Sequence, residues 1–181
     1  MQYLRHFLLA AALCAAPLAQ AETTTDEGWF FGIGGALITF DDDIDEYDPV
    51  NGYLRGGYTF NRYLDLGVEF SGSLSPDESG PTLYDVATGL LFLRGKLPLD
   101  DDSSLYAMVG ASRVKLSATA FGVDTNNSDN GVGFGFGFEH RITKTEFFAI
   151  DYMIYYDDNE FDDIPTDVTV DSLNFGFYGY F

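Results

Sequence analysis

The stretch GVGFGFGF at residues 131–138 shows the pattern that decides the fold. Every second residue is apolar, namely Val132, Phe134, Phe136 and Phe138, and the residues between them are glycines. Successive side chains point to opposite faces in a β-strand, so a period of two predicts a strand. A soluble sandwich would bury the Phe face and expose a polar one. A glycine face instead fits the narrow, crowded interior of a small barrel.

The same alternation recurs along the chain, in segments whose ranges are 28–40, 51–60, 63–73, 82–97, 104–119, 146–157 and 166–181. A tilted membrane strand needs roughly 9–11 residues in the hydrocarbon. The connections alternate between short ones, at 61–62, 97–103 and 143–145, and longer ones, at 41–50, 74–81, 120–130 and 157–165. Short periplasmic turns and longer outer loops are typical of transmembrane barrels. We therefore predict an all-β, eight-stranded antiparallel up-and-down transmembrane β-barrel, and the even number of strands places both chain termini on the periplasmic side.

Two segments carry specific predictions about their faces. In segment 104–119 we assign the four apolar residues Tyr106, Met108, Val114 and Leu116 to the lipid face. In segment 146–157 we assign the alternating apolar residues, Tyr156 included, to the lipid face and Asp151 to the interior. Segment 82–97 is apolar on both faces over residues 90–93, so the alternation leaves its register open.

The first 21 residues have the features of a secretory signal peptide. Arg5 and His6 form a basic start, an apolar run covers residues 7–18, and Ala19-Gln20-Ala21 is a small-x-small cleavage site. The apolar run is shorter than the roughly 20 residues that span a bilayer. We expect cleavage near Ala21, export to the outer membrane of a Gram-negative-type cell, and a single barrel domain at residues 22–181. The only cysteine, Cys14, lies in the signal, which excludes a disulfide framework in the mature chain.

The composition argues against nucleic-acid binding and against a disordered chain. The formal net charge is −20, and such acidity repels nucleic acid. Aromatic residues make up 17% and hydrophobic residues 46% of the chain, which is unusual for a disordered acidic protein. These apolar side chains must be shielded from water, and their alternation along the strands favours a surface that faces lipid.

Ten charged residues are predicted to face the barrel interior and to form an ion-pair network that plugs it. They are Arg55, Asp65, Glu69, Arg94, Lys96, Arg113, Lys115, Glu139, Arg141 and Asp151. The alternative is that they are solvated charges on a soluble sheet. That alternative would leave the Phe, Tyr and Leu bands as large exposed patches.

Acidic residues crowd the first and last long connections. The residues singled out are Asp41, Asp42, Asp43, Asp45, Asp157, Asp158, Asp162 and Asp163. Dense carboxylates suit Ca²⁺ or Mg²⁺, although the spacing is not that of an EF-hand. Two interpretations stay open, a divalent-cation site that faces outward and a solvated acidic rim.

The last strand ends LNFGFYGYF at residues 173–181, with alternating aromatics and a terminal phenylalanine. This resembles the C-terminal signal of bacterial outer-membrane barrels that the barrel assembly machinery reads. Gly176 and Phe181 match its glycine and terminal aromatic, whereas Gly179 stands where the family usually has a second aromatic. With GYTFN at 57–61 and LGVE at 66–69, the chain resembles the barrels of the outer-membrane protein A transmembrane-domain type, including the outer-membrane protein X type.

The family that the chain resembles includes structural anchors, adhesins and serum-resistance proteins. We expect a non-enzymatic, monomeric barrel without a cofactor, in envelope structure or surface interaction, whose partners are outer-membrane lipid and the assembly machinery. The alternatives are a narrow cation-preferring channel or a surface receptor or adhesin that binds divalent cations in its loops. A lipid-modifying enzyme is disfavoured, because His140 lacks the His-x-Ser arrangement of the deacylases and is expected near a periplasmic turn. A soluble barrel with an internal ligand cavity also stays open.

Overall fold

The computed structural model describes residues 27–42, 46–79, 82–121, 123–158, 161 and 167–181. The predicted signal peptide lies outside these residues, so its cleavage stays a prediction. The strands are β1 (Gly28–Asp41), β2 (Glu46–Tyr47), β3 (Val50–Asn61), β4 (Leu64–Ser75), β5 (Asp77–Ser79), β6 (Thr82–Pro98), β7 (Ser103–Ala120), β8 (Val123–Arg141), β9 (Glu146–Asp158) and β10 (Val168–Tyr180).

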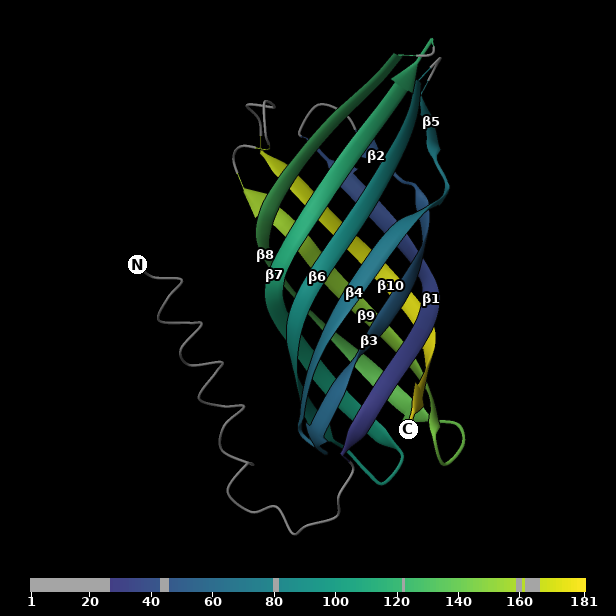
Figure 1. Ribbon diagram of the computed structural model, residues 1–181, viewed down its shortest axis with the longest axis vertical. Helices are drawn as coiled ribbons and strands as arrows, with labels where there is room; N and C mark the ends of the chain where they lie inside the picture. Colours follow the sequence, from purple (N-terminus) through teal and green to yellow (C-terminus); the bar gives the residue numbers. More distant parts are fainter. Residues whose placement is uncertain (1–26, 43–45, 80–81, 122, 159–160, 162–166) are drawn as a thin grey trace, which may run out of the picture.

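The long strands pair antiparallel in chain order, and β10 returns to pair with β1, so the sheet closes into a barrel (Figure 1). The closing register runs from Phe30 opposite Tyr180 to Asp41 opposite Thr169. The short strands β2 and β5 extend the sheet from β1 and β6. The predicted all-β, eight-stranded antiparallel barrel is therefore confirmed. Closure satisfies the backbone hydrogen bonds of both edge strands, as a chain that spans a membrane requires.

One predicted loop is a hairpin instead. Residues 120–130 were expected to form a long connection, but β7 and β8 stay paired up to Ala120 opposite Val123. Phe121 lies in the turn with a φ of 51°, a left-handed conformation that a bulky residue rarely adopts, and its side chain is 90% exposed. Asn, Ser and Asp residues give this part of β8 polar side chains on both faces, which hid the strand from a period-two search. The hairpin reaches the upper edge of the barrel in Figure 1.

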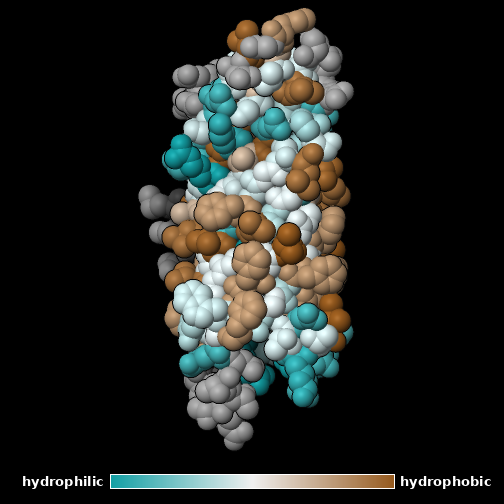
Figure 2. Space-filling model, turned by 45° about the vertical axis from the view of Figure 1, so that its right-hand side comes forward, coloured by the Kyte–Doolittle hydropathy of each residue, from teal (hydrophilic) through white to brown (hydrophobic). Residues whose placement is uncertain are grey.

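The alternation separates two environments. Large apolar side chains such as Phe70 (63% exposed) and Phe136 (66% exposed) cover the outside, whereas charged residues such as Arg55 and Arg94 are fully buried inside. On the face shown in Figure 2, hydrophobic side chains gather across the middle and hydrophilic ones lie nearer both ends. Such a band is what the lipid-facing surface of a transmembrane barrel presents. Among the described residues, no helix is long and apolar enough to span a bilayer.

The predicted faces of β7 are reversed. Tyr106, Met108, Val114 and Leu116 are buried in the interior, and Arg113 and Lys115 are exposed on the outside. The prediction that these two cations belong to the interior network is therefore wrong. The outer face of β7 carries small apolar residues below them, so both faces of this strand are apolar over most of its length. The alternation of residue types therefore could not show which face of β7 points into the barrel.

A β-bulge corrects one further assignment. Tyr156 was expected on the lipid face, but the register between β9 and β10 shifts so that Val170 pairs with Tyr156 and Asp171 pairs with Ile154. Tyr155 is the extra residue, and both tyrosines are buried. A bulge places two consecutive residues on one side of the ladder, which period-two reading cannot foresee.

Strand packing leaves no room for a side chain at Gly110, on the inner face of β7. A Cβ atom at this position would collide with the backbone carbonyl oxygen of Leu91 and lie 2.8 Å from the Cα of Phe92. Because these are backbone atoms, relief would require the β6–β7 ladder to separate.

We therefore expect Gly110→Val to prevent refolding into the compact barrel, whereas Ala111→Val, one residue along and on the outer face, refolds normally. The measurement is the mobility difference between unheated and boiled samples on a gel. A normal shift for Gly110→Val would contradict the close approach of β6 and β7.

Candidate functional site

Arg55 on β3 forms the centre of the interior. Its Nε donates to Glu69 Oε2 at 2.5 Å, and its Nη1 and Nη2 donate to the two carboxylate oxygens of Asp151 at 2.9 and 3.0 Å. All three side chains are buried, and they come from β3, β4 and β9. Strand pairing puts Arg55 directly opposite Glu69. The bidentate contact with Asp151 crosses the lumen and is the strong form of charge-assisted hydrogen bond.

Tyrosine and asparagine side chains complete the bonds of these carboxylates. Tyr155 donates to Glu69 at 2.5 Å, Tyr106 donates to Asp151 at 2.7 Å, and Asn174 donates to Asp151 at 2.9 Å. A buried charge is tolerated only when its desolvation is offset by such partners. The central layer meets that condition for all four carboxylate oxygens.

A second layer lies toward the short turns. Arg94 on β6 donates to Asp65 at 2.6 Å and to the hydroxyl of Tyr180 at 3.0 Å. Lys96 lies 3.0 Å from the other oxygen of Asp65, and Glu139 lies 3.5 Å from Arg94. The Tyr178 ring links the layers, because the guanidinium carbon of Arg55 lies 5.5 Å and that of Arg94 lies 5.9 Å from its centroid. Cations within about 6 Å of a ring face are attracted to it.

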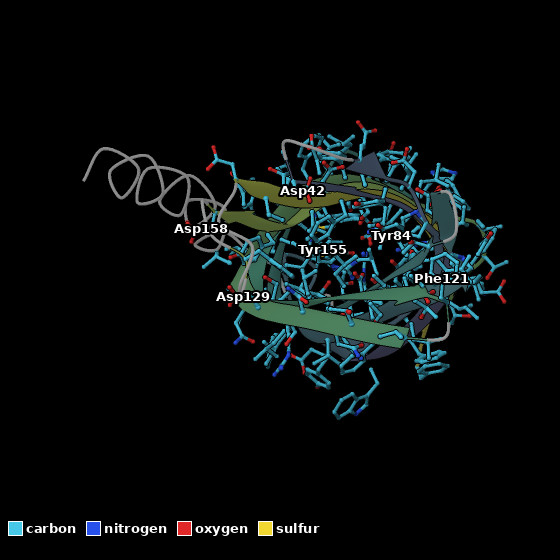
Figure 3. All side chains as sticks on the ribbon, turned by 90° about the horizontal axis from the view of Figure 1, so that it is seen from above. Asp42, Tyr84, Phe121, Asp129, Tyr155 and Asp158 are labelled. Carbon is cyan, nitrogen blue, oxygen red and sulfur yellow. The ribbon has the colours of Figure 1, made fainter. Side chains whose placement is uncertain are left out.

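Five aromatic rings close the other end of the lumen, and we call them the aromatic cap. Tyr84 stacks on Tyr47 with centroids 3.8 Å apart, and Tyr47 lies 6.2 Å from Phe40. Phe161 then meets Phe40 at 5.5 Å and Tyr156 at 5.1 Å, both edge to face. Figure 3 shows the interior crowded with side chains, with Tyr84 and Tyr155 directed into it.

Sequence reasoning missed this cap. Tyr47 and Phe161 lie within connections that were interpreted only as acidic loops, yet both are buried. The available signal was a single aromatic residue within each run of acids, as in DIDEYD at 43–48 and NEFDD at 159–163. An aromatic in an otherwise charged loop has a reason to fold back onto the core.

The lumen opens into a cavity at the end with the short turns. A vestibule of about 490 Å³ opens there, lined by polar groups that include Lys96, Glu139, Arg141 and Lys144. Arg141 is part-exposed in this vestibule, with Nε 3.8 Å from Asp102. Glu139 Oε2 and Arg94 Nη1 have no hydrogen-bond partner among the described residues. The two charged layers, around Arg94 and Arg55, follow from there along the barrel axis.

Of the ten residues predicted for the network, the structure brings seven together in the two layers. They are Arg55, Asp65, Glu69, Arg94, Lys96, Glu139 and Asp151. Arg141 lies at the vestibule, and Arg113 and Lys115 lie outside the barrel.

The acidic residues are placed only in part. Asp41 ends β1, Asp42 follows it, and Asp157 and Asp158 end β9, all at the rim. The remaining four, Asp43, Asp45, Asp162 and Asp163, lie outside the described residues. Asp41 and Asp157 both pair with Thr169 of β10 from opposite sides, which separates their strands by about 10 Å. Figure 3 shows Asp42 and Asp158 at separate points of the rim. Within the described ranges no three potential ligands form a metal cluster, so cation binding stays a prediction.

The two residues of the C-terminal signal lie in different environments. Gly176 is on the inner face, where a Cβ atom would lie 2.7 Å from the carbonyl oxygen of Ile33, and Phe181 is exposed. Their role in assembly stays a prediction.

A serine–histidine pair lies at the outer edge of the short turns. Ser103 Oγ is 3.0 Å from His140 Nδ1, and the His140 ring is parallel to Phe138 with centroids 6.4 Å apart. In a catalytic triad a carboxylate accepts a hydrogen bond from the other ring nitrogen of the histidine and orients the ring. Asp100 instead accepts hydrogen bonds from the backbone N–H groups of Asp102 and Ser103. The described residues thus assemble a serine–histidine contact without the triad geometry.

The fold, the outer apolar band and the filled charged lumen together define a small transmembrane β-barrel of the outer-membrane type. The sequence model of the protein family described as outer membrane protein beta-barrel domain matches residues 7–181. The chain therefore belongs to this family.

Solved structures agree on the fold. Neisserial surface protein A superposes with a TM-score of 0.73 at 15% identity, covering 85% of this chain and 97% of that one. The attachment invasion locus protein Ail of Yersinia pestis gives 0.63 at 22% identity, covering 85% and 98%. OprG of Pseudomonas aeruginosa gives 0.51 at 14% identity, covering 85% and 96%. None of the curated proteins compared with this chain matches it significantly.

Removal of Arg55 alone would leave Glu69 and Asp151 buried without their cation. We expect Arg55→Met to lower the free energy of unfolding by about 3–5 kcal/mol, as measured by urea unfolding in lipid vesicles. The matched control Arg62→Met, exposed in the turn between β3 and β4, should change it by about 0.5 kcal/mol or less. The triple variant R55M/E69Q/D151N should recover part of the loss, and equal losses for R55M and R62M would refute the central role of Arg55.

The turn between β6 and β7 lies outside the membrane, and its Asp100 makes a pH-dependent contact. Hydrogen bonds from the backbone N–H groups of Asp102 and Ser103 lower the pKa of Asp100 below its ordinary 3.8. A lowered carboxyl pKa stabilises the turn above the ordinary pKa, and that stabilisation is lost as the pH falls through the lowered value. We expect the amide proton shift of Ser103 to titrate with a midpoint below 3.8 and to lose this titration in Asp100→Asn. A midpoint at or above 3.8 would contradict the contact.

Proposed function

We propose that this protein is a non-enzymatic, non-conducting outer-membrane barrel that stabilises the cell envelope and presents an acidic rim to the outside. It would reach the outer membrane of a Gram-negative-type cell after signal cleavage near Ala21, with help from the assembly machinery, and act there as a monomer.

The observation that carries the proposal is the filled lumen. Arg55, Glu69 and Asp151 cross it with side chains that are fully buried or nearly so, and the aromatic cap covers them on the outer side. An ion entering from the vestibule would meet Arg94, which donates hydrogen bonds to Asp65 at 2.6 Å and to Tyr180 at 3.0 Å. Conduction would require these pairs to break in a low-dielectric space, which is costly.

Surface interaction is the part of the proposal that the rim supports. Asp41, Asp157 and Asp158 are exposed at the end opposite the short turns. The similar structures include a surface protein and an attachment invasion locus protein, and Ail has also been solved with the heparin analogue sucrose octasulfate. An acidic rim disfavours a polyanion at this position and favours a cationic partner or divalent ions, because like charges repel.

We expect refolded protein to insert into a planar bilayer without conductance steps. The double variant Y47A/F161A, which removes two rings of the aromatic cap and leaves the charged layers intact, should stay silent as well. Folding is checked in each sample by the gel shift between unheated and boiled protein.

Gly110→Val, taken through the same refolding procedure, serves as the control for contaminating pores. Steady cation-selective steps from folded wild-type protein, absent from this control, would refute the plugged lumen and establish a narrow channel instead.

A further inference from the structure

The outer surface carries one basic feature that the plugged lumen does not use. Of the nine Lys and Arg residues in the chain, Arg5 lies outside the described residues, three lie in the charged layers and three lie at the vestibule end. Only Arg113 and Lys115 remain, and both project outward from the upper part of β7. They form a local positive site on a chain whose net charge is −20.

These two side chains lie at the edge of the apolar band. Below them the outer face of β7 carries Leu105, Ala107, Val109 and Ala111, and above them it carries serine and threonine. A cation on the lipid face is strongly unfavourable at the bilayer midplane and is tolerated near the interface. Arg113 and Lys115 therefore mark the level at which the outer leaflet's charged headgroups begin on this side of the barrel.

A groove of about 520 Å³ lies directly beside the pair on the outer face. Its floor is the small residues Ala87 and Gly89 of β6, and Phe70 of β4 pairs with Gly89 on one side as Arg113 pairs with it on the other. Leu91 and Val68 line its lower part. The groove is thus apolar along its length and basic along one wall.

Both cations are available to a ligand. Arg113 Nη2 donates to Ser128 Oγ at 3.2 Å, which leaves most of its five N–H donors unused by that contact. Within the described residues, neither side chain forms an ion pair. Asp85 lies on the same face as Lys115, two residue pairs above it and opposite Ser117. Among the described residues Asp85 forms no ion pair with Lys115. Asn130 of β8, opposite Arg113, adds an amide to the same surface.

We propose that this surface is a binding site for a phosphorylated lipid of the outer leaflet. Arg113 and Lys115 bind the phosphate, Asn130 contacts the polar headgroup, and one acyl chain lies along the groove over Gly89. Charge complementarity selects the occupant, because a guanidinium and an ammonium together match a phosphate and a neutral lipid offers them nothing. The site is independent of whether the lumen conducts.

The test uses the folded full-length barrel in detergent micelles and native mass spectrometry. The probes are bisphosphorylated lipid A and the same lipid after enzymatic dephosphorylation. Wild-type protein should retain one bisphosphorylated lipid and bind the dephosphorylated lipid far more weakly. R113Q/K115Q should lower the affinity for the phosphorylated lipid roughly 10- to 30-fold, since each basic side chain near a lipid phosphate contributes on the order of 1 kcal/mol. The single variants R113Q and K115Q should each give a smaller loss, and they decide the question if the double variant does not fold.

Matched controls distinguish the contribution of the phosphate contacts to binding from that of the groove. R62Q/K144Q removes the same charge at the opposite end, where both residues are exposed, and should bind within about twofold of wild type. Gly89→Leu, where a Cβ meets only the Phe70 ring at 3.6 Å, should fill the groove and weaken both lipids, while Gly56→Leu on the outer face of β3 should not. Inorganic phosphate at millimolar concentration should fail to displace the lipid. Equal affinities for R113Q/K115Q and wild type, or for the two lipids, would overturn the proposal.

Discussion

The structure depends on the pairing of Arg55 with Glu69 and Asp151 across the lumen. A barrel of this width leaves an interior that side chains fill and water does not, so any charge placed there needs a partner from another strand. Arg55 contacts β4 through its paired neighbour and β9 through a bidentate bond over the lumen. This one side chain therefore ties opposite walls of the barrel and makes the interior solid at its centre.

The two ends of the barrel differ because the filling changes character along the axis. Toward the short turns the side chains are charged and end at the polar vestibule, where Glu139 Oε2 and Arg94 Nη1 form an ion pair at 3.5 Å without a hydrogen bond among the described residues. At the opposite end of the lumen the interior side chains are the aromatic rings of the cap, and Tyr47 and Phe161 reach this end from the segments that connect the long strands. The cap excludes water from the charged layers, which strengthens their electrostatic contacts.

The outer surface adds a second constraint, set by the depth of the bilayer. The same alternation that buries Arg55 would place outward cations in hydrocarbon, and the chain avoids this except at the outer edge of the band, on β7. There Arg113 and Lys115 adjoin a groove with a glycine and alanine floor. A lipid site of this kind would anchor the barrel at a defined depth and give its acidic rim a fixed height above the membrane.

The alternation of residue types along the chain was sufficient to predict the class of fold and most of the interior. Glycine and charge at alternate positions on β1, β3, β4 and β8 mark the inner face, because neither large apolar groups in a narrow lumen nor charges in lipid are tolerated. This reasoning located Arg55, Asp65, Glu69 and Asp151 correctly from parity alone. Three features depend on contacts between strands that are distant in the sequence. The orientation of β7 followed from closure with its neighbours, since both of its faces are apolar. The position of Tyr156 followed from a bulge, and the aromatic cap followed from the return of Tyr47 and Phe161 onto the core, because contacts between distant segments leave no periodic trace in the chain.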